Sequence, residues 1–297
     1  MLHLRETVTE HYSVLVLPSQ RRQAVLRRLT AVGEVGFAEL AEEFSVSEMT
    51  IRRDVETLEG EGLARRVRGG AISVTSRSYE PPFGVRATTA AEAKAAIGAA
   101  AARLVNDGDT IIVDVGTTTL ELARALRGRQ GITVVTAALP VAVELGNEPG
   151  IRVVVTGGQV RQGELSLTGG MAEDAFTTMN CDVAFIGVAG VCAGPGLTEY
   201  NPDDARVKRA AIGAARRTIV LADVSKLGKI AFATVAPLSA VDALVTDAPA
   251  GHAVVREIAA EGTDIISAPL PLSVEQRLSV EQRLSVEQRL SAERNPA

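Results

Sequence analysis

Residues 37–71 read FAELAEEFSVSEMTIRRDVETLEGEGLARRVRGGA and decide the fold of the N-terminal part of the chain. Apolar residues recur there at helical spacing, over a short segment that begins at Phe37 and a longer one around Ile51. Ser47 precedes the longer segment as a residue type that caps helices. The pattern then becomes that of two short strands joined at Gly69. The segment therefore predicts a helix, a tight turn, a second helix and a two-stranded wing.

A further helix is expected upstream, because residues 19–32 also carry apolar side chains at helical spacing and end before Gly33. Ser19, which follows Pro18, is the expected N-cap of this helix. In the wing, the alternation predicts four inward-facing residues, Leu63, Val67, Ile72 and Val74. Three helices followed by a wing form the geometry that inserts one helix into the major groove of DNA.

The arginines favour this interpretation, because residues 62–77 hold four of them and no acidic residue, so the wing can neutralise DNA phosphates. Arg52 and Arg53 lie on the polar face of the third helix, where the alternative is an ordinary solvated face of paired charges. The candidate DNA contacts are Ser47, Thr50, Arg52, Arg53, Arg65, Arg66 and Arg68. Ser47 is equally suited to a role as helix cap alone.

The N-terminal segment resembles the winged helix-turn-helix of the DeoR family of bacterial transcriptional regulators. The resemblance rests on RRQAVLRRL at residues 21–29 and on the stretch quoted above, which follows the family pattern VS..TIRRDL..LE..G...R.HGGA. Arg68 stands where many members have His, and Val55 stands where Leu is usual. The resemblance implies that the third helix faces DNA and that the protein binds a double-stranded operator.

From residue 89 onward, short Val- and Ile-rich runs alternate with helical segments. Strands are expected near 110–115, 132–136, 151–156, 183–188, 218–222, 243–246 and 264–267. Helices are expected near 90–105, 119–127, 139–146, 171–179, 203–216 and 251–261. Because each strand is an almost continuous apolar run, the alternation indicates a doubly wound, mostly parallel α/β domain with helices on both faces of its sheet. Such sheets bind ligands beyond the carboxyl ends of their strands.

The motif DVGTTT at residues 114–119 joins an expected strand to an expected helix. Free backbone N–H groups, the positive end of the helix dipole and threonine hydroxyls there suit a phosphate. The motif alone is weak, because the same residues also make a good turn and helix cap. Thr136, Gly157 and Gly158 follow other strand ends, so several polar segments could meet at one crevice.

The DeoR resemblance continues over residues 20–268, through DGDTIIVDVGTTTLELARAL, SLTGG, CDVAFIGVAGV, DDARVKRAAI and IVLADVSKLGK. It implies a sensor domain with a fold similar to ribose-5-phosphate isomerase and a phosphorylated sugar or polyol as effector. Asp114 would then accept hydroxyl bonds, while Lys208 and Lys226 would supply positive charge. The chain departs from the family at Ala137, where Asn is common, and at Asp204, where Glu is usual. The expected effector contacts are Asp114, Gly116, Thr117, Thr118, Thr136, Gly157, Gly158, Lys208 and Lys226.

The alternative function is that of a sugar-phosphate isomerase with a fused DNA-binding head. Proton transfer would need a carboxylate, and the candidates are Asp114, Asp182, Glu199, Asp203 and Asp204. A DNA-binding head makes sense if ligand binding itself is the output, so we expect a regulator and not an enzyme. The resemblance implies that the protein represses carbohydrate metabolism genes and that binding of the effector relieves this repression. A single head touches few bases, so we expect a homo-oligomer.

Composition sets the remaining expectations. The net charge is -5, and two cysteines and three histidines offer neither a disulfide framework nor a metal cluster, so we expect no cofactor or metal. No run of about 18 apolar residues is present, so we expect a cytoplasmic protein without membrane contact. The sequence SVEQRL occurs three times from 273 to 290, with successive repeats about 120° apart on a helix and no common apolar stripe.

The expected organisation has five parts. They are an extension at 1–18, a winged helix-turn-helix domain at 19–74, a linker at 75–88, a sensor domain at 89–270 and a disordered repeat-containing tail at 271–297. The linker is placed by Pro81, Pro82 and Gly84.

Overall fold

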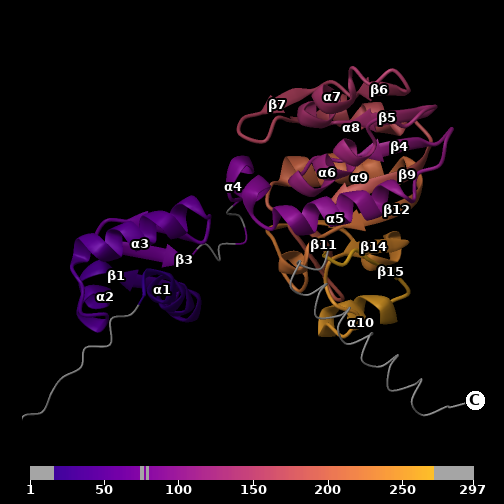
Figure 1. Ribbon diagram of the computed structural model, residues 1–297. Coiled ribbons are helices and arrows are strands. Elements are labelled where there is room, and N and C mark those ends of the chain that lie inside the picture. The colour runs from indigo at the N-terminus through magenta and orange to yellow at the C-terminus, as the bar shows by residue number, and fades with distance from the viewer. Residues whose placement is uncertain (1–16, 74–76, 78–79, 271–297) are drawn as a thin grey trace, which may run out of the picture. The chain divides into compact units, whose positions relative to one another are not determined.

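The computed structural model describes residues 17–73, 77 and 80–270, and the chain divides into two compact units, 1–81 and 82–297 (Figure 1). The extension expected at 1–18 falls almost entirely outside the described residues, as does the whole tail expected at 271–297. The expected linker is too long, because residues 82–88 belong to the second unit and Phe83–Thr88 form helix α4. No helix in the described ranges is long and apolar enough to cross a membrane.

The first unit is a three-helix domain with a small antiparallel sheet. Its helices are α1 Pro18–Val32, α2 Phe37–Glu43 and α3 Glu48–Gly60, and its strands are β1 Glu34–Gly36, β2 Ala64–Val67 and β3 Gly70–Ser73. The strand order is β1-β3-β2, which adds to the expected wing a strand that the sequence did not predict. Its core contains Val25, Leu29, Phe37, Leu40, Ile51, Val55 and Leu58.

Helix α1 begins two residues earlier than expected, because its N-cap is Leu17 and not Ser19. Leu17 occupies the N-cap position with extended backbone, and Pro18 stands at the first helical position. Proline fits there because its missing N–H would have no partner and its fixed φ is already helical. Ser19 is therefore inside the helix and is not its cap. The helix ends at Gly33, whose positive φ of 84° suits glycine.

The wing has a different inward face from the one the alternation predicted. Ala64 and Ala71 are fully buried, whereas Leu63 and Val67 are 39% and 42% exposed. The register pairs Arg66 with Ala71 and Arg65 with Ile72. Paired residues in an antiparallel sheet share a face, so Arg66 lies on the side of the core and Arg65 on the opposite side. Alanine fills the inward positions because α3 passes close to the strand.

The second unit contains a seven-stranded sheet in the order β15-β14-β12-β9-β4-β5-β6, with every pair parallel. The strands are β4 Thr110–Val113, β5 Ile132–Thr136, β6 Ile151–Val155, β9 Cys181–Gly187, β12 Ala215–Leu221, β14 Ala243–Thr246 and β15 Asp264–Ser267. The helices are α5 Ala91–Ala102, α6 Thr117–Ala125, α7 Leu139–Leu145, α8 Gly170–Thr177, α9 Pro202–Gly213 and α10 Ala253–Ala260. The expected mixed α/β architecture with a parallel sheet is confirmed.

Helices cover both faces of this sheet, and alternate strand residues point to opposite cores. Ile111 and Val113 of β4 join α5, α6 and α7 in one cluster, whereas Ile112 joins α8 and α9 in another. Strands β5 and β6 extend the sheet to one side of β4, while β9, β12, β14 and β15 extend it to the other side. The order therefore reverses between β4 and β9. In open parallel sheets this reversal opens a crevice at the carboxyl ends of the two strands.

Two smaller sheets stand beside the large one in the second unit. Strands β7 Gln159–Arg161 and β8 Ser166–Thr168 form a hairpin. Strands β10 Gly190–Cys192, β11 Gly196–Glu199 and β13 Ala233–Ala236 form a three-stranded sheet. The sequence did not predict these strands, because they are short and do not stand out as Val- and Ile-rich runs that alternate with helical segments. A short 3-10 helix, η1, spans Val224–Lys226.

Candidate functional site

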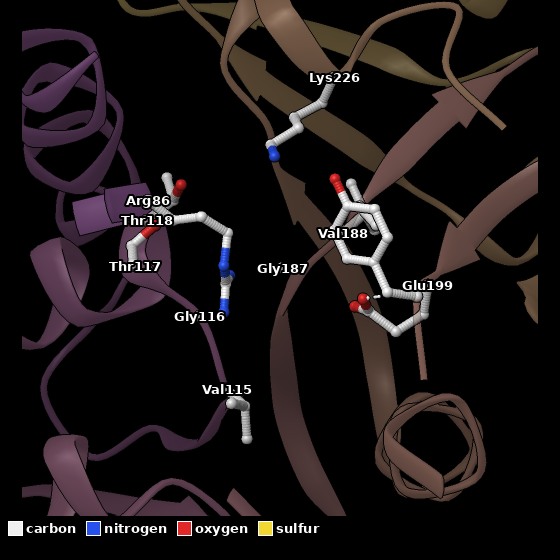
Figure 2. Close-up of a pocket in the computed structure, with 11 residues that line it drawn as sticks. Arg86, Val115, Gly116, Thr117, Thr118, Gly187, Val188, Glu199 and Lys226 are labelled. Atoms are coloured by element: carbon white, nitrogen blue, oxygen red, sulfur yellow. Dashed lines mark hydrogen bonds between the residues drawn. The ribbon is translucent and has the colours of Figure 1, made fainter. Parts of the chain in front are cut away.

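A pocket lies at the point where the strand order reverses, beside the carboxyl ends of β4 and β9 (Figure 2). The segment Val115–Thr118, which follows β4, forms one wall. Residues 187–189 at the end of β9 form another wall. The lining is completed by Arg86 of α4, by Glu199 at the end of β11 with Tyr200 after it, and by Lys226 of η1. The pocket therefore collects residues from five parts of the second unit at the place where a doubly wound sheet binds ligands.

The N-terminus of α6 faces this pocket. Gly116 precedes the helix with a φ of 153°, and a Cβ at this position would lie 3.2 Å from the Thr119 hydroxyl oxygen. That hydroxyl donates to the Gly116 carbonyl at 3.0 Å and closes the first turn. Within the described residues, the hydroxyls of Thr117 and Thr118 have no hydrogen-bond partner. The first-turn N–H groups and these two hydroxyls are therefore available to an anion.

Two cations enter the pocket from opposite elements. The side chains of Arg86 and Lys226 reach into the space beside Thr117 and Thr118 (Figure 2). Arg86 forms an ion pair with Glu164, which lies in the β7–β8 connection. Among the described residues, Lys226 forms no ion pair through its ammonium group. Burial lowers the pKa of Lys226, and the charges of Lys229 and Arg86 lower it further against the opposing effect of Asp223.

A third cation, Lys94 of α5, lies behind Arg86. Its ammonium group donates to the carbonyl oxygen of Thr89 at 2.8 Å and to that of Arg86. Burial lowers the pKa of Lys94 to about 8, assisted by the positive charges of Lys226 and Arg86 and opposed by Asp223. Burial is the main reason that the pKa values of these two lysines are lowered, and repulsion by neighbouring cations adds to the effect. An added anion would relieve this repulsion.

Asp114 and Lys208 lie below the pocket and bind each other. The Lys208 ammonium pairs with Asp114, donates to the Gly187 carbonyl at 3.0 Å and lies 3.4 Å from a Glu199 oxygen. Asp114 also accepts from the Gly187 N–H at 3.0 Å. Burial favours neutral forms at both sites, so it raises the pKa of Asp114. The charges of Asp114 and Glu199 nevertheless raise the pKa of Lys208. This network joins β4 to β9, and neither Asp114 nor Lys208 lines the pocket.

The other expected effector contacts lie elsewhere. The Thr136 hydroxyl is fully buried, donates to the Val113 carbonyl at 2.6 Å and accepts from the Ala138 N–H at 3.0 Å. Gly157 and Gly158 lie against α8 and β8, where added Cβ atoms would approach the side chain of Met171 and the backbone of Thr168. The structure therefore brings Gly116, Thr117, Thr118 and Lys226 together but not these three residues.

Helix α3 carries candidate DNA contacts on its exposed face. Ser47 is its N-cap and accepts from the Thr50 N–H at 3.2 Å, while both side chains remain at least partly exposed. Arg52 pairs with Glu48 at 3.5 Å and lies 4.7 Å from the centroid of the Phe37 ring. Arg53 is exposed and its side chain has no ion pair in the part of the chain that the structure describes. Arg53 is therefore the more available of the two arginines.

The wing arginines also differ in whether their guanidinium groups already form ion pairs. Arg66 pairs with Glu56 at 2.5 Å and with Glu59 at 2.6 Å, so it is tied to α3. The backbone N–H of Arg66 also donates to Glu59, and this bond lowers the pKa of that carboxyl. Arg65 and Arg68 are exposed and form no ion pair within the described residues. An unpaired guanidinium on the outer side of a wing is suited to phosphate contact.

Comparisons with known proteins decide the family. Residues 21–77 match the model described as DeoR-like helix-turn-helix domain, and residues 89–248 match the model described as DeoR C terminal sensor domain. The regulator YulB of Bacillus subtilis is 33% identical over 255 residues, which are 86% of this chain and 98% of that protein. This chain belongs to the DeoR family. It is a DNA-binding transcriptional regulator and not an enzyme.

Another DeoR-family relative has a more specific name. The glycerol-3-phosphate regulon repressor of Escherichia coli K12 is 33% identical over 231 residues, which are 78% of this chain and 91% of the repressor. Among solved structures, ribose 5-phosphate isomerase A of Methanocaldococcus jannaschii aligns with a TM-score of 0.34 and 19% identity. The aligned part covers 45% of this chain and 52% of the isomerase chain. This last likeness is distant.

Sequence reasoning missed two cations at this site, which are Arg86, a residue of the pocket lining, and Lys94, which donates to the Arg86 carbonyl. Arg86 was placed in a linker, because prolines precede it and no periodic pattern marks a six-residue helix. Lys94 was not singled out by the sequence, because it lies within an alanine-rich segment that was expected only to form a helix near 90–105. Glu199, by contrast, was considered only as a catalytic carboxylate. Its oxygens instead accept from the Tyr200 N–H at 2.7 Å and pair with Lys208.

Proposed function

We propose that this protein is a repressor whose affinity for operator DNA is lowered by a phosphorylated sugar or polyol bound in the α6 pocket. The observation that carries the proposal is the convergence of Arg86, Lys226 and the open N-terminus of α6 on one space. Three sources of positive potential around unused threonine hydroxyls are suited to a phosphate group. The printed name of the glycerol-3-phosphate relative supports an effector of this chemical class.

The DNA contacts in this proposal are the exposed side chains of α3 and the wing. Arg53, Arg65 and Arg68 carry the charge, and Thr50 lies between Arg53 and the helix cap. Exposed Met49 shares one helix face with Arg53 and offers an apolar contact for a thymine methyl group. Two or more heads in a homo-oligomer supply specificity for repeated half-sites. The protein then acts in the cytoplasm, where its DNA is.

The test is a thermal-shift titration of the full chain with glycerol 3-phosphate and ribose 5-phosphate, beside glycerol and ribose. We expect only the phosphorylated compounds to raise Tm, since a ligand that binds the native state stabilises it by mass action. The variant Thr117→Ala/Thr118→Ala should lose the shift. Its matched control, Thr177→Ala/Thr178→Ala, removes two exposed hydroxyls at the end of α8 and should keep it. Equal shifts with and without phosphate would refute the proposal.

The direction of regulation needs a DNA assay. With a stabilising phosphorylated compound in hand, we expect its addition to weaken binding of the protein to its operator in a gel-shift titration. Arg53→Ala should weaken operator binding without changing Tm or the ligand-induced shift, because its side chain lies outside the core of the first unit. Tighter operator binding in the presence of ligand would show an activator-like response instead.

A further inference from the structure

Helix α4 is held in the second unit by charges and not by a buried apolar face. None of its residues is buried, although Phe83 packs against the edge of the main core. The Arg86 side chain pairs with Glu164, and the Lys94 ammonium binds carbonyl oxygens at Arg86 and Thr89. Arg86 lines the pocket, and Lys94 binds the carbonyl oxygen of Arg86. Any anion that enters the pocket therefore acts on the groups that fix α4.

Glu164 supplies the carboxylate that pairs with the Arg86 guanidinium. Its side chain is 5% exposed, that of Arg86 is 15% exposed, and in the described residues this carboxylate has no other hydrogen-bond or ion-pair partner. Arg86 also lines the pocket into which α6 directs its first turn. The guanidinium thus has two anionic partners within reach of one side chain, which are Glu164 and a phosphate at the N-terminus of α6.

We propose that the effector phosphate draws Arg86 away from Glu164, and that this exchange of partners shifts α4 and carries ligand occupancy to the start of the sensor unit. The proposal rests on the proposed function of the pocket. Helix α4 begins at Phe83, directly after Pro81 and Pro82, where the division between the two units falls. Two consecutive prolines have fixed φ angles and form a stiff connection. A shift of the first turn of α4 therefore acts on the residues that adjoin this boundary.

Two variants at opposite ends of the ion pair test the exchange, with inorganic phosphate as the probe and calorimetry on the full chain. Arg86→Gln removes a phosphate ligand, so we expect affinity to fall about tenfold. Glu164→Gln removes the competing carboxylate, so we expect affinity to rise roughly fivefold, because the phosphate then no longer has to displace this ion pair. Arg206→Gln removes a surface arginine paired with Glu173 and Asp203, and should change nothing.

An introduced tryptophan can report the movement of α4, because the chain contains no tryptophan of its own. Phe83→Trp places a single fluorophore on α4, 5.7 Å from the Arg86 guanidinium in the parent chain. Saturating phosphate should change its emission, and Arg86→Gln in the same background should abolish the change even at saturation. In the Glu164→Gln background, the emission without phosphate should already approach that of the phosphate-bound protein.

The outcomes separate this inference from the proposed function. Phosphate binding that Thr117→Ala/Thr118→Ala weakens, but that neither Arg86→Gln nor Glu164→Gln alters, would overturn the partner exchange and leave the pocket assignment intact. Weaker binding in both ion-pair variants would show that the pair only supports the fold. A constant Phe83→Trp emission during saturation would refute the movement of α4. Failure of the parent chain to bind phosphate or any phosphorylated compound would refute both proposals.

Discussion

Asp54 and Arg21 show how much a single pair of residues contributes to the DNA-binding unit. Asp54 of α3 and Arg21 of α1 are 4% and 7% exposed, and their charged atoms lie 2.5 Å apart. Removing one member of a buried pair leaves the other charge poorly compensated, at a cost of about 3–5 kcal/mol. The pair also fixes the angle between α1 and α3, and therefore the presentation of the exposed face of α3.

We predict that Asp54→Asn lowers the free energy of unfolding of the first unit by about 3 kcal/mol. Urea denaturation followed by circular dichroism measures this loss. The matched control is Glu39→Gln, which removes an exposed carboxylate that lies 2.5 Å from Arg28. Both side chains of that pair are about half exposed, so the control should lose less than about 1 kcal/mol. Equal losses in the two variants would show that the burial of Asp54 has no special energetic role.

At the same scale, Lys94 predicts a pH dependence of ligand binding. In the free protein its pKa is lowered to about 8, so much of the side chain is neutral at pH 8.5. A bound phosphate dianion favours the ammonium form and raises that pKa. Binding therefore takes up a proton, and the affinity falls as pH rises above 8. The lowered pKa of Lys226 acts in the same direction.

The measurement is calorimetry with glycerol 3-phosphate at pH 8.5 in two buffers of different ionisation enthalpy. The second pKa of a phosphate monoester is about 6, so the ligand itself contributes no proton change at this pH. We expect a net uptake of a fraction of a proton in the parent chain and a smaller uptake in Lys94→Met. Zero uptake in the parent chain would contradict the role of the lysines in ligand binding.

At the scale of elements, the pleat of β2 separates two arginines that are adjacent in the sequence. Arg65 lies on the face opposite to α3, while Arg66 is held by Glu56 and Glu59. We predict that Arg65→Ala reduces the slope of log affinity against log salt by about one, the effect expected from loss of one phosphate contact. Arg66→Ala should reduce it less. Fluorescence anisotropy with duplex DNA measures both slopes, and a larger effect for Arg66 would reverse the assignment of faces.

How far the sequence predicted each element depended on its length and periodicity. The seven parallel strands and six large helices were expected close to their observed bounds, because long apolar runs leave few alternatives. The wing was expected but its inward face was not, since Ala64 and Ala71 give a weaker hydrophobic signal than Leu63 and Val67. Helix α4 and the short strands were missed, because local patterns cannot show elements that tertiary contacts fix.

The candidate pocket was predicted only where one continuous motif formed it. Gly116, Thr117 and Thr118 follow one strand, so their shared location could be read from the chain. Thr136 ends a neighbouring strand, but its hydroxyl is used by the backbone of the second unit. Sequence spacing shows which strand ends share an edge of the sheet, but it cannot show which side chains are already bonded. Arg86 was missed for the complementary reason, because it reaches the pocket from outside the sheet.

At the scale of the whole molecule, the division into two units separates the sites of input and output. The first unit has its own core around Phe37 and Ile51, and the second has separate cores on the two faces of its sheet. The proposed effector contacts all lie in the second unit, whereas the candidate DNA contacts all lie in the first. A ligand at the pocket therefore stabilises the second unit directly.

This arrangement predicts two thermal transitions, of which the effector shifts one. At a free concentration of glycerol 3-phosphate 100 times its Kd, the second unit should gain about 2.7 kcal/mol, while the first should gain almost nothing. Differential scanning calorimetry of the full chain should show that ligand raises the midpoint temperature of one transition and leaves the other unchanged. The unchanged transition should be the one whose midpoint Asp54→Asn lowers, which identifies it as that of the first unit. Thr117→Ala/Thr118→Ala should remove the shift. If the ligand raises the midpoints of both transitions by the same amount, the two units unfold cooperatively. That result would contradict the prediction, because the separate cores of the two units do not explain such coupling.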